Sequence, residues 1–315
     1  MNNTIKGYIK IARFDHWIKQ AFILPGVVFA IFMENIYDVK QIISYFWIIC
    51  FGFLATSMVA SANYVINEWL DAEFDKYHPV KKNRPLLTSN LKIKWILLEY
   101  LCLLIFGLFI SFLISKPVFI MESWLAVMGI VYNVKPLRSK DIPYIDVLSE
   151  SLNNAIRLLI GWFLITNRIL PPLSIVLGYW MGGAFLMAIK RFAEYRMIGN
   201  PTTAALYRKS FLYYNEKKLL VSSFFYALLS IFFCGIFLIK YKIELLISIP
   251  FICGLFAIYL DIAYKSDSAV QKPEKLFKEK ILMLYLIFLC ILILFLLFIK
   301  LPFLYVFLNK TFIEI

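Results

Sequence analysis

The chain has 315 residues, of which 62% are hydrophobic, and its 33 Lys and Arg residues outnumber 20 Asp and Glu residues to give a net charge of +13. Several uninterrupted apolar runs exceed the roughly 20 residues that cross a bilayer core. This composition excludes a soluble globular enzyme and predicts an integral membrane protein. The run from 281 to 299 is apolar on every side, which favours α-helices over the alternating strands of a barrel.

Nine transmembrane helices are predicted from hydropathy windows of about 19 residues. In chain order they cover residues 18–35, 43–67, 95–114, 117–133, 144–166, 169–189, 219–239, 244–264 and 281–308. Residues 1–13 show no pattern of a cleavable signal peptide. No long linker interrupts the helices, so residues 1–315 are expected to form a single transmembrane domain.

The cations gather in alternate connections between these helices. Lys and Arg number four in residues 1–19, six in 69–95, three in 134–143, seven in 190–218 and five in 265–280. The positive-inside rule places these segments, and with them the amino terminus, on the cytoplasmic side of what we expect to be a bacterial plasma membrane. The net charge therefore reports mainly the orientation of the chain in the membrane. It predicts contact with the lipid bilayer and with anionic ligands, and no nucleic-acid partner is indicated.

Five Cys residues lie in apolar runs without CxxC spacing, and the chain has only two His residues. These counts argue against a zinc site and against His-based catalysis.

A row of oxygen-bearing side chains ends the second predicted span. Asn67, Asp71 and Asp75 are spaced i, i+4, i+8 and therefore share one helix face, with Glu68 one position round. Carboxylate and amide oxygens are ligands of Mg²⁺, which commonly binds one or two carboxylates together with substrate phosphates. The row predicts a Mg²⁺ site, although a solvated acidic helix end would show the same spacing.

A stiff basic segment follows the acid row. In "HPVKKNRP" two prolines enclose Lys81, Lys82 and Arg84, so the helix ends and cations stand beside the acids. Metal-binding acids next to phosphate-binding bases favour a diphosphate substrate. Membrane topology alone could also account for these bases.

The segment "NEWLDAEFD" is similar to the NDxxDxxxD signature of the UbiA superfamily of intramembrane prenyltransferases. The resemblance implies an all-α bundle of about nine helices around a cavity open to the cytoplasm. It also implies a Mg²⁺-dependent transferase that acts on a diphosphate substrate in the membrane.

One branch of that superfamily, decaprenyl-phosphate phosphoribosyltransferase, shows four further local similarities. "HWIKQ" (16–20) resembles QWxKN, "DAEFDKYHPVKKNRP" (71–85) resembles DxxxDxxHPxKxxRP, "AIRLLIG" (155–161) resembles IRAIAG, and "AIKRFAEYR" (188–196) resembles GKRYAEL. The chain departs from that branch at Glu68, where Asp is usual. In addition, "YNVKPLRSKDIPYIDV" (132–147) is more similar to the YSxPPLRLK loop of ordinary prenyltransferases.

The resemblance implies a function and a set of roles. The function is transfer of 5-phosphoribose from phosphoribosyl diphosphate to a polyprenyl phosphate; the alternative is transfer of a prenyl group from its diphosphate to an aromatic or lipid acceptor. Asn67, Asp71 and Asp75 would be catalytic through Mg²⁺, with Glu68 assisting as a metal ligand. The residues implied to bind substrates are Lys19, Lys81, Arg84, Arg157, Lys190, Arg191 and Glu194.

The position of Lys190, Arg191 and Glu194 is where typical superfamily members carry a second aspartate-rich motif. Two cations and one acid suit direct phosphate contacts better than metal chelation. An ordinary pair between Lys190 and Glu194 along one helix is the simpler interpretation.

Other polar residues lie within the predicted spans. Arg157 is about 13 residues into the fifth span, and we expect either a structural role or a lipid-phosphate anchor. Glu99 and Glu122 are expected at the membrane interfaces. A transporter is disfavoured because the acids gather on one side and no repeat is visible.

Overall fold

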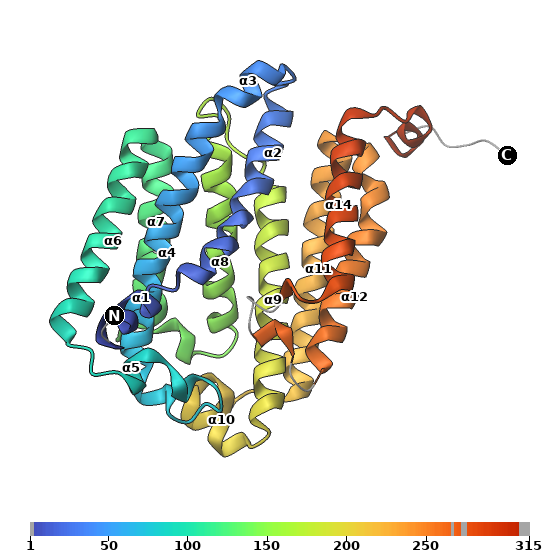
Figure 1. Cartoon of the computed structure of the whole chain (residues 1–315). Coiled ribbons are helices and arrows are strands. Elements are labelled where there is room, and N and C mark those ends of the chain that lie inside the picture. The colour runs from blue at the N-terminus through green and yellow to red at the C-terminus, as the bar shows by residue number, and fades with distance from the viewer. Residues whose placement is uncertain (1–2, 266–267, 272–275, 309–315) are drawn as a thin grey trace.

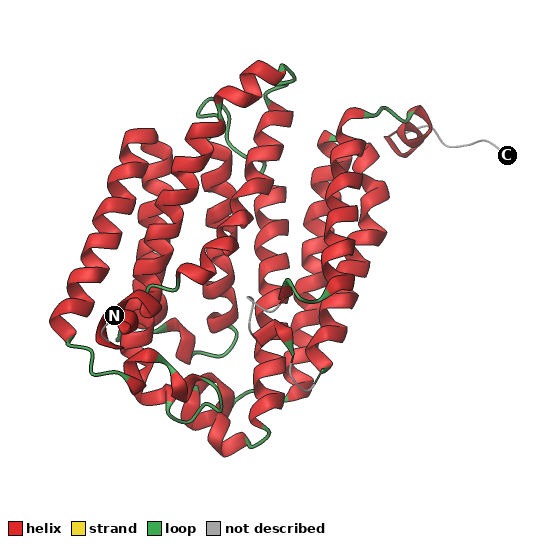
Figure 2. Cartoon of the chain, in the orientation of Figure 1, coloured by secondary structure: helices red, strands yellow, loops and turns green. Residues whose placement is uncertain are grey.

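The structure, a computed structural model, describes residues 3–265, 268–271 and 276–308. These residues form helices and connecting loops, with no strand among them (Figure 2). The helices are α1 (Asn3–Ile11), α2 (Leu24–Met33), α3 (Val39–Ser44), α4 (Phe46–Asp75), α5 (Pro85–Thr88), α6 (Ile93–Ile114), α7 (Lys116–Asn133), α8 (Ile145–Phe163), α9 (Leu173–Ile198), α10 (Pro201–Tyr207), α11 (Glu216–Tyr241), α12 (Ile249–Tyr264) and α14 (Lys280–Phe298). A 3-10 segment, η1 (Phe14–Ile23), joins α1 to α2.

Within the described residues, seven helical segments are long and apolar enough to cross a membrane. They are Ile5–Met33, Val39–Asp75, Ile93–Ile114, Leu173–Ile198, Glu216–Tyr241, Ile243–Tyr264 and Lys280–Phe298. The all-α membrane fold is therefore confirmed. The two further crossings expected from the sequence coincide with α7 and α8, whose charged side chains lower their hydropathy, and they stay predictions.

Two predicted ends differ from the structure. The second span was expected to end at 67, but α4 continues to Asp75, so the whole acid row lies on one unbroken helix. The last span was expected to reach 308, but α14 ends at Phe298. Ile299 is extended, and Pro302, which cannot donate a helical hydrogen bond, begins a separate 3-10 turn.

The long helices lie side by side in one bundle (Figure 1). Helix α4 packs on α6 and α7, α8 packs on α2, α7 and α9, and α9 packs on α11. The short helices α5 and α10 lie at one end of the bundle, whereas α3 lies at the other (Figure 1). Helix α8 contacts three other helices, and Asp146, Ser151 and Arg157 along it are buried.

Two glycines allow α2 and α8 to approach unusually closely. A Cβ atom on Gly26 would lie 2.0 Å from the carbonyl oxygen of Leu158, and one on Gly161 would lie 2.0 Å from that of Ile23. Small residues permit such backbone contact between helices in membranes. This crossing holds η1, which precedes α2, against the middle of α8.

Candidate active site

The acid row lies at the end of α4, and its first two members touch. Asn67 Nδ2 donates to Asp71 Oδ2 over 3.2 Å, and Asn67 also contacts Asn133 at the end of α7. Among the described residues, no three His, Cys, Asp or Glu side chains converge as metal ligands. The oxygens gathered here are the carboxylate of Asp71 and the amides of Asn67 and Asn133, a donor set suited to a hard cation.

The loop between α7 and α8 brings two cations to Asp71. Arg138 Nη2 lies 3.0 Å from Asp71 Oδ1, and the Lys140 ammonium contacts the same oxygen. Lys140 Nζ also donates to Asn133 Oδ1 over 2.7 Å. Burial lowers the pKa of Lys140 to about 8, against the attraction of Asp71. Asp71 is thus neutralised from within the protein by the loop at 134–144.

The remaining acids of the row face other partners. Asp75 is paired with Arg84, as the proximity of acids and bases in the sequence suggests. Glu68 turns toward the amino-terminal segment, where its carboxylate lies 3.3 Å from Arg13 and accepts a 3.4 Å hydrogen bond from the backbone N–H of Leu86. Glu68 therefore ties α4 to the amino-terminal segment and to α5.

The basic segment after α4 reaches the end of α9. Lys81 Nζ lies 2.6 Å from Glu194 Oε1, and the Tyr207 hydroxyl donates to the same oxygen over 2.9 Å. His78 Nδ1 accepts hydrogen bonds of 3.1 Å from two backbone N–H groups, so its Nε2 carries the proton and faces Glu194 at 3.3 Å. Burial lowers the pKa of both Lys81 and His78. Glu194 is thus the meeting point of two segments that are 113 residues apart.

Local structure explains why Tyr207 returns to this point. Gly199 ends α9 with a φ of 68°, a left-handed conformation that glycine adopts without steric cost. Asn200 then caps α10 by accepting hydrogen bonds from two backbone N–H groups, and Pro201 occupies the first turn. The chain therefore reverses, and α10 carries Tyr207 and Arg208 back toward the acids.

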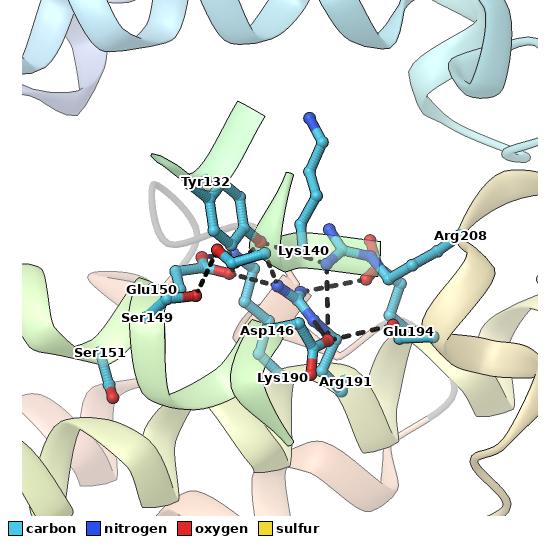
Figure 3. A network of polar contacts seen from close by, with 12 residues as sticks. Tyr132, Lys140, Asp146, Ser149, Glu150, Ser151, Lys190, Arg191, Glu194 and Arg208 are labelled. Atoms are coloured by element: carbon cyan, nitrogen blue, oxygen red, sulfur yellow. Dashed lines mark hydrogen bonds and ion pairs between the residues drawn. The ribbon is translucent and has the colours of Figure 1, made fainter. Parts of the chain in front are cut away.

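Arg191 lies at the centre of a charged network (Figure 3). Its guanidinium contacts Glu150, lies 3.4 Å from Asp146 and 3.4 Å from Glu194, and donates to the Tyr132 hydroxyl over 2.9 Å. The residue is only 1% exposed. Arg191 therefore holds three carboxylates together, and its direct contact with a phosphate stays a prediction.

Lys190 and Arg208 border this network. Lys190 Nζ lies 2.9 Å from Glu150, so among the described ion pairs Lys190 joins α9 to α8 instead of pairing with Glu194 along α9. Arg208 Nη1 lies 3.6 Å from Asp146 and donates to the Tyr132 hydroxyl over 3.1 Å. The ammonium of Lys190 is partly exposed, unlike the guanidinium of Arg191, and can meet a ligand directly.

Two predicted site residues lie apart from this network. Lys19 contacts His16 on the same segment and lies over the Tyr64 ring. Arg157 donates to Gln20 rather than to any carboxylate. Glu122, for which a position at a membrane interface was expected, is fully buried beside Thr56 between α4 and α7.

The sequence analysis singled out none of the partners that complete the site. These are Tyr132, Asn133, Arg138, Lys140, Asp146, Glu150, Tyr207 and Arg208. Six of them lie in or next to the stretch at 132–147. The resemblance of this stretch to the loop of ordinary prenyltransferases was the one sequence feature that could have identified them. Chemically, buried cations beside carboxylates can exchange partners with a phosphorylated ligand and a divalent cation.

The adjacent lysines 81 and 82 offer a matched test of the link to α9. Lys81→Ala should lower the thermal unfolding midpoint by a few degrees, because Glu194 would lose its shortest ion pair while buried. Lys82 is exposed, so Lys82→Ala should change the midpoint little. Equal shifts in the two variants, measured in the same detergent, would remove the structural role given to Lys81.

The sequence model of the UbiA prenyltransferase family matches residues 23–281. Among curated proteins, decaprenyl-phosphate phosphoribosyltransferase of Mycobacterium tuberculosis is 27% identical over 214 residues, which cover 66% of this chain and 66% of that protein. The enzyme of the same name from Corynebacterium glutamicum is 27% identical over 215 residues, 66% of this chain and 60% of its own length. The matched region thus spans somewhat less than two thirds of these relatives.

The solved structures show the same fold. A UbiA homolog from Archaeoglobus fulgidus, bound to DMAPP and Mg²⁺, superimposes with a TM-score of 0.66 at 18% sequence identity, covering 91% of this chain and 99% of that one. A structure of digeranylgeranylglyceryl phosphate synthase gives a TM-score of 0.59 at 17% identity, covering 94% of this chain and 98% of that one. With the family match over most of its length, the chain belongs to the UbiA prenyltransferase family.

Proposed function

We propose that this protein transfers 5-phosphoribose from phosphoribosyl diphosphate to a polyprenyl phosphate. One observation carries the proposal: Lys81 of the segment "HPVKKNRP" and Glu194 of "AIKRFAEYR" form one ion pair of 2.6 Å. These two segments are the specific points of similarity to the phosphoribosyltransferase branch. Their convergence supports a single site built from both.

The proposal includes a Mg²⁺ ion held by Asn67, Asp71 and Asp75. The amide and carboxylate oxygens of this row fit such an ion, and solved UbiA homologs are described as bound to Mg²⁺. When bound, Mg²⁺ would neutralise charge on the leaving diphosphate. Glu68 would assist as a metal ligand; its carboxylate meets Arg13, as that of Asp75 meets Arg84, and both acids would exchange these cations for the metal.

The reaction needs little proton chemistry from the protein. An oxygen of the polyprenyl phosphate dianion attacks C1 of the ribose, and the bond from C1 to the diphosphate oxygen breaks. The diphosphate leaves with the electron pair, and the product is a phosphodiester. The residues of the chain therefore have to align two anions and stabilise the leaving charge.

The cations around the acid row divide into two groups by exposure. Lys81, Arg84 and Lys190 keep part of their side chains exposed and would meet the donor phosphates. Lys140 is almost fully buried against Asp71 and would change partner from that carboxylate to the diphosphate when the metal binds. Arg191 would position Glu150 and Glu194.

The alternative reaction is prenyl transfer from a prenyl diphosphate. It is favoured by the loop at 132–147, whose Arg138 and Lys140 reach Asp71, since that loop resembles the one in ordinary prenyltransferases. The acid row would serve both reactions in the same way. The second cationic motif on α9 is what favours the phosphoribosyl donor.

A direct assay separates the two reactions. Purified protein with Mg²⁺ and polyprenyl phosphate would receive labelled phosphoribosyl diphosphate in one reaction, and labelled prenyl diphosphate with an aromatic acceptor in another. We expect label in the lipid fraction only in the first. Label entering the aromatic acceptor instead would establish prenyl transfer.

Donor selectivity gives a second prediction. Phosphoribosyl diphosphate should bind more tightly than farnesyl diphosphate, and ribose 1-diphosphate, which lacks the 5-phosphate, should bind poorly. The reason is that each lost contact between a phosphate and a cation such as Lys190 costs about 1.5 to 3 kcal/mol. Competition binding in Mg²⁺ measures this order. Easy displacement by farnesyl diphosphate would argue for the prenyl donor.

We also propose that the site faces the cytoplasm of a bacterial cell. The loops that carry it are the cation-rich ones, and α5 and α10 lie at the same end of the bundle (Figure 1). Labelling of a cysteine introduced at exposed Lys82 should require permeabilised or inverted membranes. Labelling in intact cells would reverse the orientation.

A further inference from the structure

Arg157 is a buried cation for which the described residues offer no carboxylate within ion-pair distance. It is 9% exposed and lies on α8, a helix that packs on α2, α7 and α9. Its neighbours are neutral: Nε donates to Gln20 Oε1 over 2.7 Å, and Nη1 donates to the carbonyl oxygen of Asn153 over 3.1 Å. An unpaired charge at such a depth is costly and points to an anionic ligand.

The neighbouring amide presents a second unused donor. Gln20 is fully buried, its Oε1 accepts from Arg157, and its Nε2 has no hydrogen-bond partner. Among the described residues, Arg157 Nη2 also has no partner. Gln20 thus carries a buried donor without a partner, and its other amide atom is hydrogen-bonded to a guanidinium that has no carboxylate partner. Buried donors are rarely left in this state unless something accepts from them.

The nearest acid does not fill this role. Glu122 lies close enough to influence the charge on Arg157, but its carboxylate contacts Thr56 on α4. Asn154 Oδ1, at 3.4 Å from Nη1, is neutral. The charge on Arg157 is thus oriented by hydrogen bonds without being neutralised by them.

The location of these donors relates them to the charged network. The contact with the Asn153 carbonyl shows that the Arg157 side chain runs back toward the start of α8. Glu150, which joins Lys190 and Arg191, lies three residues before Asn153, a rise of about 4.5 Å along the helix. An anion on Arg157 would therefore lie roughly one helical turn from the network.

We propose that Arg157 Nη2 and Gln20 Nε2 form a second anion site, which binds the phosphate monoester head group of the isoprenoid acceptor. The assignment rests on the proposed function, because it names where the acceptor of that reaction binds. A lipid phosphate fits better than free phosphate, since Ile18 and Leu24 on the segment that carries Gln20 are about half exposed and apolar. The tail would leave along this segment into the bilayer.

The test uses the full chain in detergent and farnesyl monophosphate as the probe. Arg157→Gln should weaken its binding about 10- to 100-fold, because a charge-assisted hydrogen bond is lost. Arg157→Lys should recover part of the affinity. Binding of phosphoribosyl diphosphate with Mg²⁺ should be unchanged in both variants. Arg168→Gln, in the exposed loop before α9, is the matched control and should behave as wild type.

Gln20→Glu keeps the proposal testable if Arg157 variants fail to fold. The new carboxylate has the same shape as the amide and would form an ion pair with Arg157, so the unfolding midpoint should hold or rise. Binding of farnesyl monophosphate should nevertheless fall at least about tenfold, because the unused donor and the net positive charge are both removed. A structural role for Gln20 alone would leave that binding unchanged.

The outcomes separate this site from the proposed donor. Wild-type binding of farnesyl monophosphate by Arg157→Gln, or equal affinity for farnesol, would overturn the site. Equal competition by inorganic phosphate would assign it to a free anion instead of a lipid. If phosphoribosyl diphosphate fails to bind but farnesyl monophosphate binds through Arg157, the donor assignment is wrong and the anion site stands.

Discussion

Asp71→Asn should lower turnover by about a thousandfold. The amide keeps the shape of the side chain but removes the charge that would hold Mg²⁺ against the leaving diphosphate, and loss of one such electrostatic group costs about 100- to 1,000-fold in enzymes. Because Asp71 also neutralises Lys140 and Arg138, the variant should gain affinity for phosphates in the absence of metal. Donor binding with and without Mg²⁺ therefore gives a readout independent of activity.

Glu73 provides the matched control for this prediction. It lies on the same helix, two residues from Asp71, and is exposed. Glu73→Gln removes an identical charge and should leave both turnover and metal dependence unchanged. Turnover near the wild-type rate in Asp71→Asn, with the same dependence on Mg²⁺, would contradict the metal assignment.

Gly161→Val should prevent accumulation of folded protein. A Cβ atom at this position would lie 2.0 Å from the Ile23 carbonyl oxygen, which is backbone and cannot rotate away. The change must push α2 from α8, and overpacking of this kind costs about 1 to 3 kcal/mol or more. It should also break the contact between Gln20 and Arg157, because η1 lies against α8 through the same crossing.

The same substitution at two glycines tests whether the close contact between α2 and α8 causes the loss of stability. Gly161→Ala should lower the unfolding midpoint, whereas Gly235→Ala should hold or raise it. Gly235 lies within α11, and its Cβ would meet nothing within 4 Å. Alanine there gains about 1 kcal/mol in helix propensity. A rise in both midpoints, measured by thermal unfolding in one detergent, would show that the close approach of α2 and α8 is not required.

The sequence predicted those features that depend on local patterns. Apolar runs placed the long helices, since burial in lipid needs only length and composition. Spacing of four residues placed Asn67, Asp71 and Asp75 on one face, and the structure keeps them on one helix. The proline-bounded segment after them was correctly expected beside the acids, and Arg84 pairs with Asp75.

Such local patterns could not predict ion pairs between residues that are far apart in the sequence. Arg138 and Lys140 are 67 and 69 residues from Asp71, and nothing in either segment specifies the other. Arg191 was expected to touch phosphate because it stands where typical superfamily members carry a second aspartate-rich motif. Its burial could not be read from the sequence, since Asp146 and Glu150 reach it only after α8 packs against α9.

The network around Arg191 also constrains the order in which the helices can insert into the membrane. Glu150 is synthesised 41 residues before Arg191, which is about 2 to 8 seconds at ordinary rates of translation. During that interval the acids of α8 lack their basic partners on α9. Transfer of α8 from water into lipid is therefore unfavourable. We therefore expect α8 to enter the bilayer together with α9, as a hairpin whose opposite charges are already joined, and a ribosome stalled before Arg191 should leave α8 accessible to water.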